Sequence, residues 1–143
     1  MPESLPQKPP KSHFSSKAKM CEGNLMSIVT TILATLVAAE FFFILYLETI
    51  ATTSDRTAKV FGMTTAELNR PSVNTLFKNQ GVYNGLIAVL VLVAVFGFAS
   101  KTAVVALMLY IVAVAAYGSV TSSPKIILTQ GGLAILTLLS CLL

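Results

Sequence analysis

The sequence predicts an all-α membrane protein: an antiparallel bundle of four transmembrane helices, with a short amphipathic helix in the first loop. Two observations lead to this prediction. Of the 143 residues, 55% are hydrophobic and only 11% are charged, whereas about a quarter of the residues in soluble domains are charged. A soluble protein of this size cannot bury so much apolar surface. The apolar residues also fall into four runs near the ~20 residues that a helix needs to cross a bilayer: about 26–50, 81–99, 103–120 and 125–143.

A polar, basic segment precedes the first apolar run. Residues 1–24 contain four prolines and four lysines, a composition that cannot bury a core, so we expect a disordered basic tail ahead of a four-helix transmembrane domain over 25–143. The lysines could rest on anionic lipid headgroups. The apolar run that follows is longer than the ~7–15 residues of a signal-peptide core, so we expect it to be retained as a membrane helix.

The long first loop, residues 51–78, contains the signals of a short helix. Thr64-Thr65-Ala66-Glu67 has the capping-box spacing, in which a hydroxyl and a carboxylate accept from opposing backbone N–H groups. We expect Pro71 to end that helix and Ser72 to cap the next one. The other two connections are short turns, and short connections between helices predict antiparallel neighbours.

Small residues recur at four-residue spacing within two of the runs, at Ala34/Ala38 and at Gly81/Gly85. In lipid, such rows allow two helix backbones to approach closely. We therefore interpret both rows as helix-packing faces.

The orientation in the membrane is not fixed by basic residues. Four lysines of the tail and Lys101 lie on one side, while four basic residues of the loop and Lys125 lie on the other. The count of Lys and Arg that normally sets topology is therefore tied. The length of the tail favours a cytoplasmic N-terminus in a multi-pass protein of the cell membrane.

Two carboxylates lie inside the first apolar run. Glu40 lies ~15 Å along a helix from Ile50, near the middle of a ~30 Å hydrocarbon core, and Glu48 lies close to the loop end. The two are ~12 Å apart along the axis, beyond the ~5–10 Å of paired-acid glycosidases. Ionisable residues within spans usually face the bundle interior and mark sites, so Glu40 and Glu48 are candidate catalytic residues. Alternatively, Glu40 bonds a neighbouring helix and Glu48 pairs with Lys125 or Arg56.

Amide and phenol side chains gather in the half of the membrane near the long loop. We expect them to line a blind polar pocket that opens toward the loop, with Glu40 at its floor and Glu48 near its mouth. The opposite half offers mainly hydroxyls, which can bond to their own helices. The amides could instead join helices, at ~0.6 kcal/mol each, and the tyrosines could lie at the membrane interface. The candidate ligand-binding residues are Asn79, Gln80, Tyr83, Asn84, Tyr117 and Gln130.

Several of these residues belong to short motifs: Glu40 followed by Ile44-Leu45-Tyr46-Leu47-Glu48, then Lys59-Val60-Phe61-Gly62, Asn79-Gln80-Gly81-Val82-Tyr83-Asn84-Gly85, Tyr117-Gly118 and Gln130-Gly131. In these motifs residues 28–143 resemble the domain of unknown function 1304 family, small four-helix membrane proteins of bacteria and fungi. That family's pattern has His after the first Glu and Trp after the second, where this chain has Phe41 and Thr52. The resemblance implies the fold but no settled activity, and a mechanism that requires the His is in doubt here.

Three functional hypotheses remain open. The protein could bind a small lipophilic molecule, or transform it by isomerisation or ring hydration through general acid–base catalysis with Glu40 as proton donor or acceptor. It could be a proton-coupled exporter similar to the small multidrug-resistance transporters, which also carry a Glu in the first of four helices. It could also be a structural subunit of a larger membrane complex.

Other classes of function lack their motifs. The sequence contains no Gly-rich phosphate loop, Cys/His metal cluster or nucleophilic triad motif, and two cysteines indicate neither a disulfide framework nor a metal site. We therefore expect no metal, no cofactor and no nucleic-acid partner. The expected partners are membrane lipids and a small lipophilic ligand. Whether the chain is an enzyme, and its oligomeric state, are left open.

Overall fold

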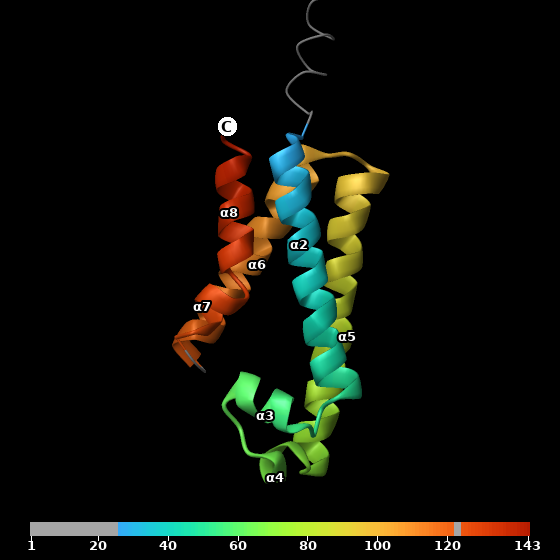
Figure 1. Cartoon of the computed structure of the whole chain (residues 1–143), viewed down its shortest axis with the longest axis vertical. Coiled ribbons are helices and arrows are strands. Elements are labelled where there is room, and N and C mark those ends of the chain that lie inside the picture. Colours follow the sequence, from blue (N-terminus) through green and yellow to red (C-terminus); the bar gives the residue numbers. More distant parts are fainter. Residues whose placement is uncertain (1–25, 122–123) are drawn as a thin grey trace, which may run out of the picture.

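The computed structural model describes residues 26–121 and 124–143, and within these ranges every regular element is a helix (Figure 1). The all-α prediction is confirmed for these residues, while the tail predicted over 1–24 lies outside them. The elements are α2 (Ile28–Leu45), the π-helical turn η1 (Tyr46–Ile50), α3 (Asp55–Phe61), α4 (Thr65–Leu68), α5 (Pro71–Leu92), the π-helical turn η2 (Val93–Gly97), α6 (Lys101–Thr121), α7 (Ile126–Thr129) and α8 (Gly132–Ser140).

Three helical segments are long and apolar enough to cross a membrane. They are Ile28–Ile50 with 23 residues, Pro71–Gly97 with 27 and Lys101–Thr121 with 21. Each exceeds the ~20 residues that a bilayer core requires. They correspond to the first three predicted runs, 26–50, 81–99 and 103–120.

The second of these segments begins earlier than its apolar run, at Pro71. Arg70 is the N-cap of α5 and Pro71 is its first helical residue. Proline suits that position because its φ is already helical and its missing N–H would have no partner there. Ser72 is therefore inside the helix, and the prediction that it caps the helix is wrong.

The fourth apolar run does not form one helix. Residues 126–129 form α7 and residues 132–140 form α8, with the break between them at Gln130 and Gly131. A Cβ at Gly131 would lie 2.6 Å from the carbonyl oxygen of Ile127 and 3.2 Å from the Cβ of Ala115, so glycine allows the chain to turn tightly against the end of α7 and to pack closely on α6. The prediction of a continuous helix over 125–143 is wrong, and a bundle of four membrane-spanning helices is not confirmed.

The first loop holds two short helices. In α4 the Thr64 hydroxyl accepts from the Glu67 backbone N–H while the Glu67 carboxylate accepts from the Thr64 backbone N–H, which confirms the predicted capping box. Helix α3, which was not predicted, is capped by Ser54. Its buried Thr57 donates to the carbonyl of Ala51 at 2.7 Å, and this bond fixes α3 to the end of η1.

Helices α2 and α5 run antiparallel, side by side (Figure 1). Ala34 and Ala38 of α2 and Ala88 of α5 are all buried. A Cβ at Gly85 would lie 2.8 Å from the Leu45 side chain, and a Cβ at Gly81 would collide with the Thr49 hydroxyl. The two rows of small residues are therefore packing faces, as predicted.

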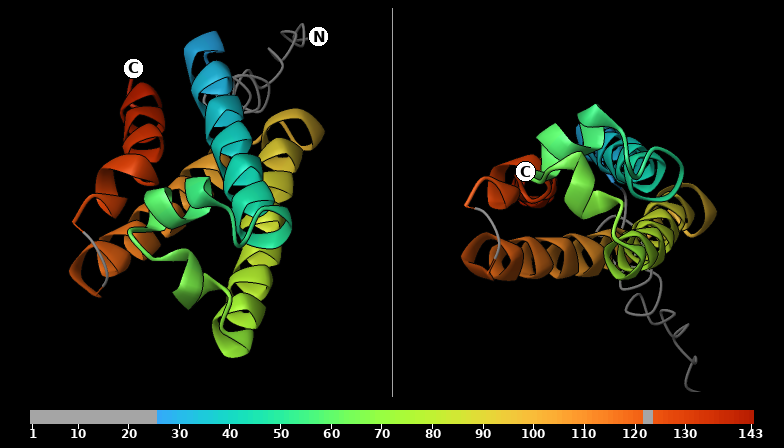
Figure 2. Two further views of the ribbon diagram at one scale, coloured as in Figure 1. Left: turned by 60° about the horizontal axis from the view of Figure 1, so that its bottom comes forward. Right: turned by 90° about the horizontal axis from the view of Figure 1, so that it is seen from below.

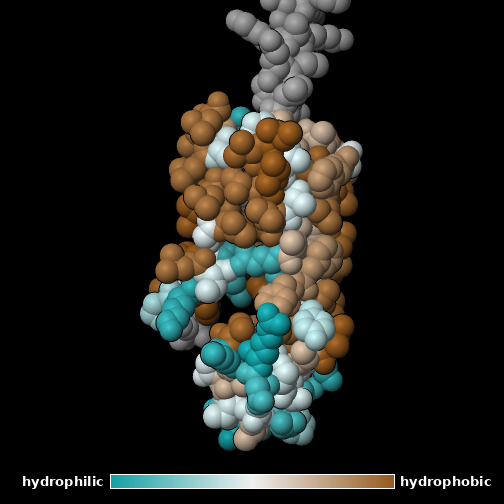
Figure 3. All heavy atoms as spheres, viewed as in Figure 1, coloured by the Kyte–Doolittle hydropathy of each residue, from teal (hydrophilic) through white to brown (hydrophobic). Residues whose placement is uncertain are grey.

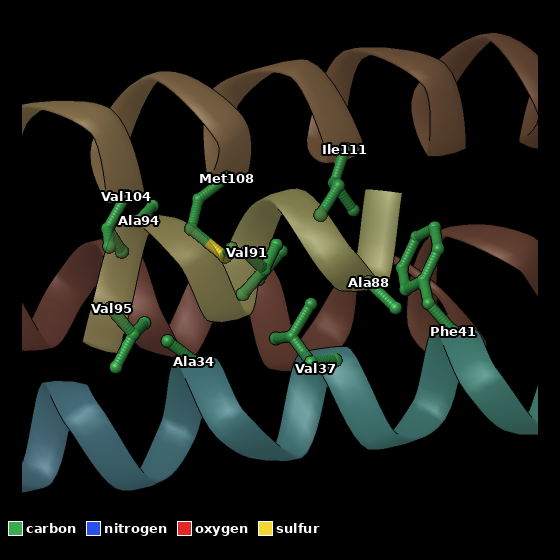
Figure 4. Packing of buried hydrophobic residues seen from close by; sticks show 12 residues of the cluster. Ala34, Val37, Phe41, Ala88, Val91, Ala94, Val95, Val104, Met108 and Ile111 are labelled. Carbon is green, nitrogen blue, oxygen red and sulfur yellow. The ribbon is translucent and has the colours of Figure 1, made fainter. Parts of the chain in front are cut away.

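The apolar core lies between α2, α5 and α6. Figure 4 shows Met108 and Ile111 of α6 pointing toward Val91 of α5 and Val37 of α2. Each of these four side chains is at most 2% exposed. Helix α8 packs against α2 and α6 and contributes Ala134 to the same core.

In the half of the molecule that contains this core, most hydroxyls bond to their own helices, as predicted. Thr35 donates to the carbonyl of Thr31 at 2.7 Å, and Thr137 donates to the carbonyl of Leu133 at 2.7 Å. Thr30 is different, because its hydroxyl lies 2.9 Å from that of Ser140 and so joins α2 to α8. This half of the molecule is closed and well packed.

The other half is more open. Helix α6 leans away from α5 toward its Thr121 end, and α3 faces α7 across the space that this leaves (Figures 1 and 2). The residues predicted to form a site are concentrated in this half.

Candidate functional site

A cavity of about 580 Å³ lies among α2, η1, α5 and α6 in the open half of the molecule. Pockets that bind small organic molecules have volumes of ~300–1,000 Å³ and mostly apolar walls with a few polar groups. This cavity has that character. The lining residues are Phe41, Glu48, Gln80, Tyr83, Asn84, Leu86, Ile87, Leu90, Tyr110, Ile111, Val114, Gly118, Ile126 and Gln130.

The acid in this cavity is Glu48. Its side chain is 4% exposed, and that of Asn84 is 7% exposed. The Asn84 side-chain amide donates to Oε2 of Glu48 at 2.6 Å. This short contact joins η1 to α5 at the wall of the cavity.

The π-helical turn η1 determines where Glu48 points. The N–H of Ala51 donates to the carbonyl of Tyr46, five residues back, at 2.9 Å. Such a turn contains one residue more than an α-helical turn, and π turns occur frequently at functional sites. The Glu48 carbonyl accepts from the Thr52 hydroxyl at 2.7 Å. The extra residue changes the direction of Glu48 relative to the helix above it.

Glu40 does not line this cavity. It is half-buried, and its Oε2 atom is buried without a hydrogen-bond partner among the described residues. The neighbouring Phe41 does line the cavity. The prediction that Glu40 forms the floor of the pocket is therefore wrong, and the acid among the lining residues is Glu48.

Five of the eight predicted site residues meet at this cavity: Glu48, Gln80, Tyr83, Asn84 and Gln130. Besides Glu40, Asn79 and Tyr117 are not among the lining residues, and both side chains are exposed, that of Tyr117 by 74%. Tyr83 lines the cavity but is still 65% exposed. The contacts expected of Glu48 with Lys125 or Arg56 are replaced by the bond to Asn84, and the Arg56 guanidinium lies 5.0 Å from the centre of the Phe43 ring.

A second cavity, of about 550 Å³, lies between α3 and α7. Sequence reasoning missed its two lysines, Lys59 and Lys125, as site residues. The available signal was Lys59, the first residue of the Lys59-Val60-Phe61-Gly62 motif. Figure 3 shows hydrophilic groups around the hollow in the lower half of the molecule, below a hydrophobic upper half. The lining residues are Lys59, Val60, Phe61, Gly62, Met63, Lys125, Ile126, Thr129 and Gln130.

The described residues offer no metal site by their arrangement. Across residues 26–121 and 124–143, no three His, Cys, Asp or Glu side chains come together in a group that could hold a metal ion. We therefore assign no metal ligand and no cofactor-binding residue.

Comparison with known proteins identifies the family. The model of a family described as "Protein of unknown function (DUF1304)" matches residues 35–142. A protein of Lactococcus lactis subsp. lactis (strain IL1403), named "Uncharacterized protein YpaA", is 59% identical over 116 residues, which are 80% of this chain and 98% of that protein. No solved structure gives a significant match. The resemblance carried by the sequence motifs is thus confirmed, and the chain belongs to the DUF1304 family.

Proposed function

We propose that this chain is an integral membrane protein that binds a small, largely apolar molecule in the cavity among α2, η1, α5 and α6. Glu48 and Asn84 would hold the polar group of that molecule. One observation supports the proposal above all: a buried carboxylate, hydrogen-bonded to a buried amide, borders a mostly apolar cavity of about 580 Å³.

The cost of this arrangement supports a role in binding. Burying a carboxylate is unfavourable unless it is hydrogen-bonded, and acids within membrane spans usually serve a function. The bond from Asn84 uses one oxygen of Glu48. The other oxygen of the carboxyl group is then available for a hydrogen bond with a hydroxyl or N–H group of a ligand.

The same geometry supports acid–base chemistry. A carboxyl group that borders a bound molecule can donate a proton to it or accept one from it. We propose that Glu48 has the role first assigned to Glu40, in an isomerisation or ring hydration, with Gln80, Tyr83 and Gln130 orienting the molecule.

The first experiment is to purify the protein in mild detergent and identify co-purified molecules by native mass spectrometry. The molecule found is then titrated against the parent, Glu48→Gln and Glu40→Gln, and the ligand-dependent rise in melting temperature is measured. We expect Glu48→Gln to lose most of this rise and Glu40→Gln to keep it, since Glu40 lies outside the cavity.

Three outcomes would contradict parts of the proposal. A full rise with Glu48→Gln would reject Glu48 as the binding group, and unchanged turnover would reject it as the catalytic acid. A Val114→Trp variant, which fills the cavity from α6, should abolish binding, and a full rise would place the ligand elsewhere. Recovery of one stoichiometric protein partner and no small molecule would favour the structural-subunit alternative.

A further inference from the structure

We infer that the ligand of the proposed site is an amphipathic anion. Its carboxylate or phosphate head would lie between Lys59 and Lys125 in the second cavity, and its apolar body would occupy the first cavity. This inference rests on the proposed function and names the chemical class of the ligand.

The two cavities are neighbours. Ile126 and Gln130 line both of them, so the short helix α7 and the residue after it form a shared wall. A molecule longer than the first cavity would extend past these two side chains into the second. It would run from a mostly apolar space to a more polar one.

The second cavity suits an anionic group. Its lining includes two lysines, Lys59 from α3 and Lys125 from the segment before α7, and it includes no Asp or Glu. Both lysine side chains are exposed, so their ammonium groups remain hydrated until an anion arrives. Thr129 and Gln130 add neutral hydrogen-bonding groups to the same wall.

The charge distribution fixes the direction of the ligand. An anion at the inner end would be buried among apolar side chains and beside the Glu48 carboxyl group, without a cationic partner, and burying an unpaired charge is unfavourable. At the outer end it would meet two ammonium groups. The apolar body therefore lies inward, where Leu86, Leu90 and Val114 form the wall, and a hydroxyl or ring oxygen on that body could reach Glu48.

The test compares dodecanoate with dodecanol, two probes with the same chain and different head charge. Binding of each radiolabelled probe to the protein in phosphatidylcholine nanodiscs is measured at low ionic strength, with empty nanodiscs subtracted. Exposed ion pairs are each worth a few tenths to ~1 kcal/mol, so with two lysines we expect the parent to prefer dodecanoate by ~3- to 30-fold. The preference should fall as salt is added.

The decisive variant is Lys59→Gln combined with Lys125→Gln. We expect it to lose the preference for dodecanoate and to keep the affinity for dodecanol. Lys78→Gln is the matched control, because Lys78 is exposed on α5 near the same loop and lines neither cavity. It should retain the preference.

The outcomes separate this inference from the proposed function. If dodecanol and dodecanoate bind the parent equally and Val114→Trp abolishes both, the apolar cavity stands and the anion inference fails. If the double lysine variant loses both probes together, the lysines are structural and the inference also fails. If neither probe binds the parent, both proposals are overturned for single-chain molecules.

Two further arms identify the source of the anion. Repeating the measurement in phosphatidylglycerol nanodiscs shows whether a bilayer lipid competes for the lysines, and loss of the dodecanoate preference there would identify the lipid headgroup as the source. A preference that survives would identify a free amphipathic acid. Full displacement of dodecanoate by inorganic phosphate alone would show that the two cavities act separately, which contradicts the inference.

Discussion

At the scale of single residues, the two acids of the first span have opposite surroundings. Glu48 is buried and accepts a hydrogen bond from Asn84. Glu40 has a buried oxygen with no partner among the described residues. A buried polar atom without a partner costs free energy, whereas a satisfied one is close to neutral. Glu48 is therefore stabilised by its contact with Asn84, whereas the burial of Glu40 is locally destabilising.

This contrast gives a prediction for stability. Glu48→Leu would leave the Asn84 amide without its acceptor, and we expect it to lower the free energy of unfolding by about 1 kcal/mol, between the ~0.6 kcal/mol average for hydrogen bonds in lipid and the ~1–3 kcal/mol cost of an unsatisfied group. Glu40→Leu should leave that free energy unchanged or raise it. Unfolding in mixed detergent with increasing dodecyl sulfate measures both, with Glu48→Gln as the control that retains an acceptor. Equal effects of the two Leu variants would contradict the assignment.

Helical spacing predicted part of the site, but not which of the two candidate acids lines the cavity. Gln80 and Asn84 are four residues apart and share one face, and both line the cavity. Asn79 precedes Gln80 and so points ~100° away from it, which explains its absence from the lining. The position of Glu40 outside the cavity and the central place of Glu48 in it could not be predicted, because a π turn has no signature in the residue types of η1.

At the scale of elements, Gly81 and Gly85 allow α5 to approach η1 and α2. A Cβ at Gly81 would collide with the Thr49 hydroxyl and lie 3.0 Å from the Cβ of Glu48. Gly132 at the start of α8 has no atom within 4 Å of such a Cβ. Substitution by alanine should therefore change the free energy of unfolding in opposite directions at Gly81 and at Gly132.

We expect Gly81→Ala to lower the free energy of unfolding by ~1–3 kcal/mol through overpacking. Gly132→Ala should raise it by up to ~1 kcal/mol, because alanine loses less conformational entropy in a helix. The same unfolding titration measures both changes. Since Gly81 also adjoins Glu48, Gly81→Ala should reduce ligand binding while Gly132→Ala does not. A stabilising Gly81→Ala would show that α5 does not lie this close to η1.

Two residues that follow helices have a left-handed backbone conformation, which suits glycine better than alanine. Gly62 ends α3 with φ of 66°, and a Cβ there would meet no atom within 4 Å, whereas Ala99 follows η2 with φ of 46°. A left-handed conformation costs a side-chain-bearing residue ~1–2 kcal/mol. We expect Gly62→Ala to destabilise and Ala99→Gly to stabilise by about 1 kcal/mol each, measured by thermal unfolding. The same sign for both would contradict this backbone account.

The elements themselves were largely readable from the sequence. The capping box of α4 and the extents of the long helices follow from residue types and apolar runs. The break between α7 and α8 was missed because the whole apolar run was counted as one span, although Gly131 and Gly132 stand side by side and glycine weakens a helix interior. Helix α3 was missed because its seven residues are too few to show a clear periodicity.

At the scale of the whole molecule, the proposed membrane insertion predicts which groups share a side. Lys59 and Lys125 line one cavity at the open end, while Lys101 begins α6, a helix of 21 residues that ends at Thr121. An α6 that crosses the bilayer would put Lys101 on the opposite side. The equal numbers of basic residues do not show which side faces the cytoplasm. They do not affect the expectation that Lys101 lies on the opposite side from Lys59 and Lys125.

Single cysteines at these three positions, in a background with Cys21 and Cys141 replaced by serine, test the relation. In intact cells, a membrane-impermeant maleimide should label either both Lys59→Cys and Lys125→Cys or neither of them. Lys101→Cys should be labelled only if those two are not. Labelling after permeabilisation controls for reactivity. Labelling of Lys59→Cys and Lys101→Cys from the same side would rule out a membrane-crossing α6.

The π-helical turn has a consequence for how this site can change through evolution. The extra residue in η1 means that the row containing Ala34 and Ala38 and the segment carrying Glu48 follow different registers along one span. An insertion or deletion within this turn would rotate the acid toward another part of the cavity wall while the packing of α2 on α5 above it is kept. If the proposed binding at Glu48 holds, a change in chain length at this one turn would alter the specificity of the site and leave the core unchanged.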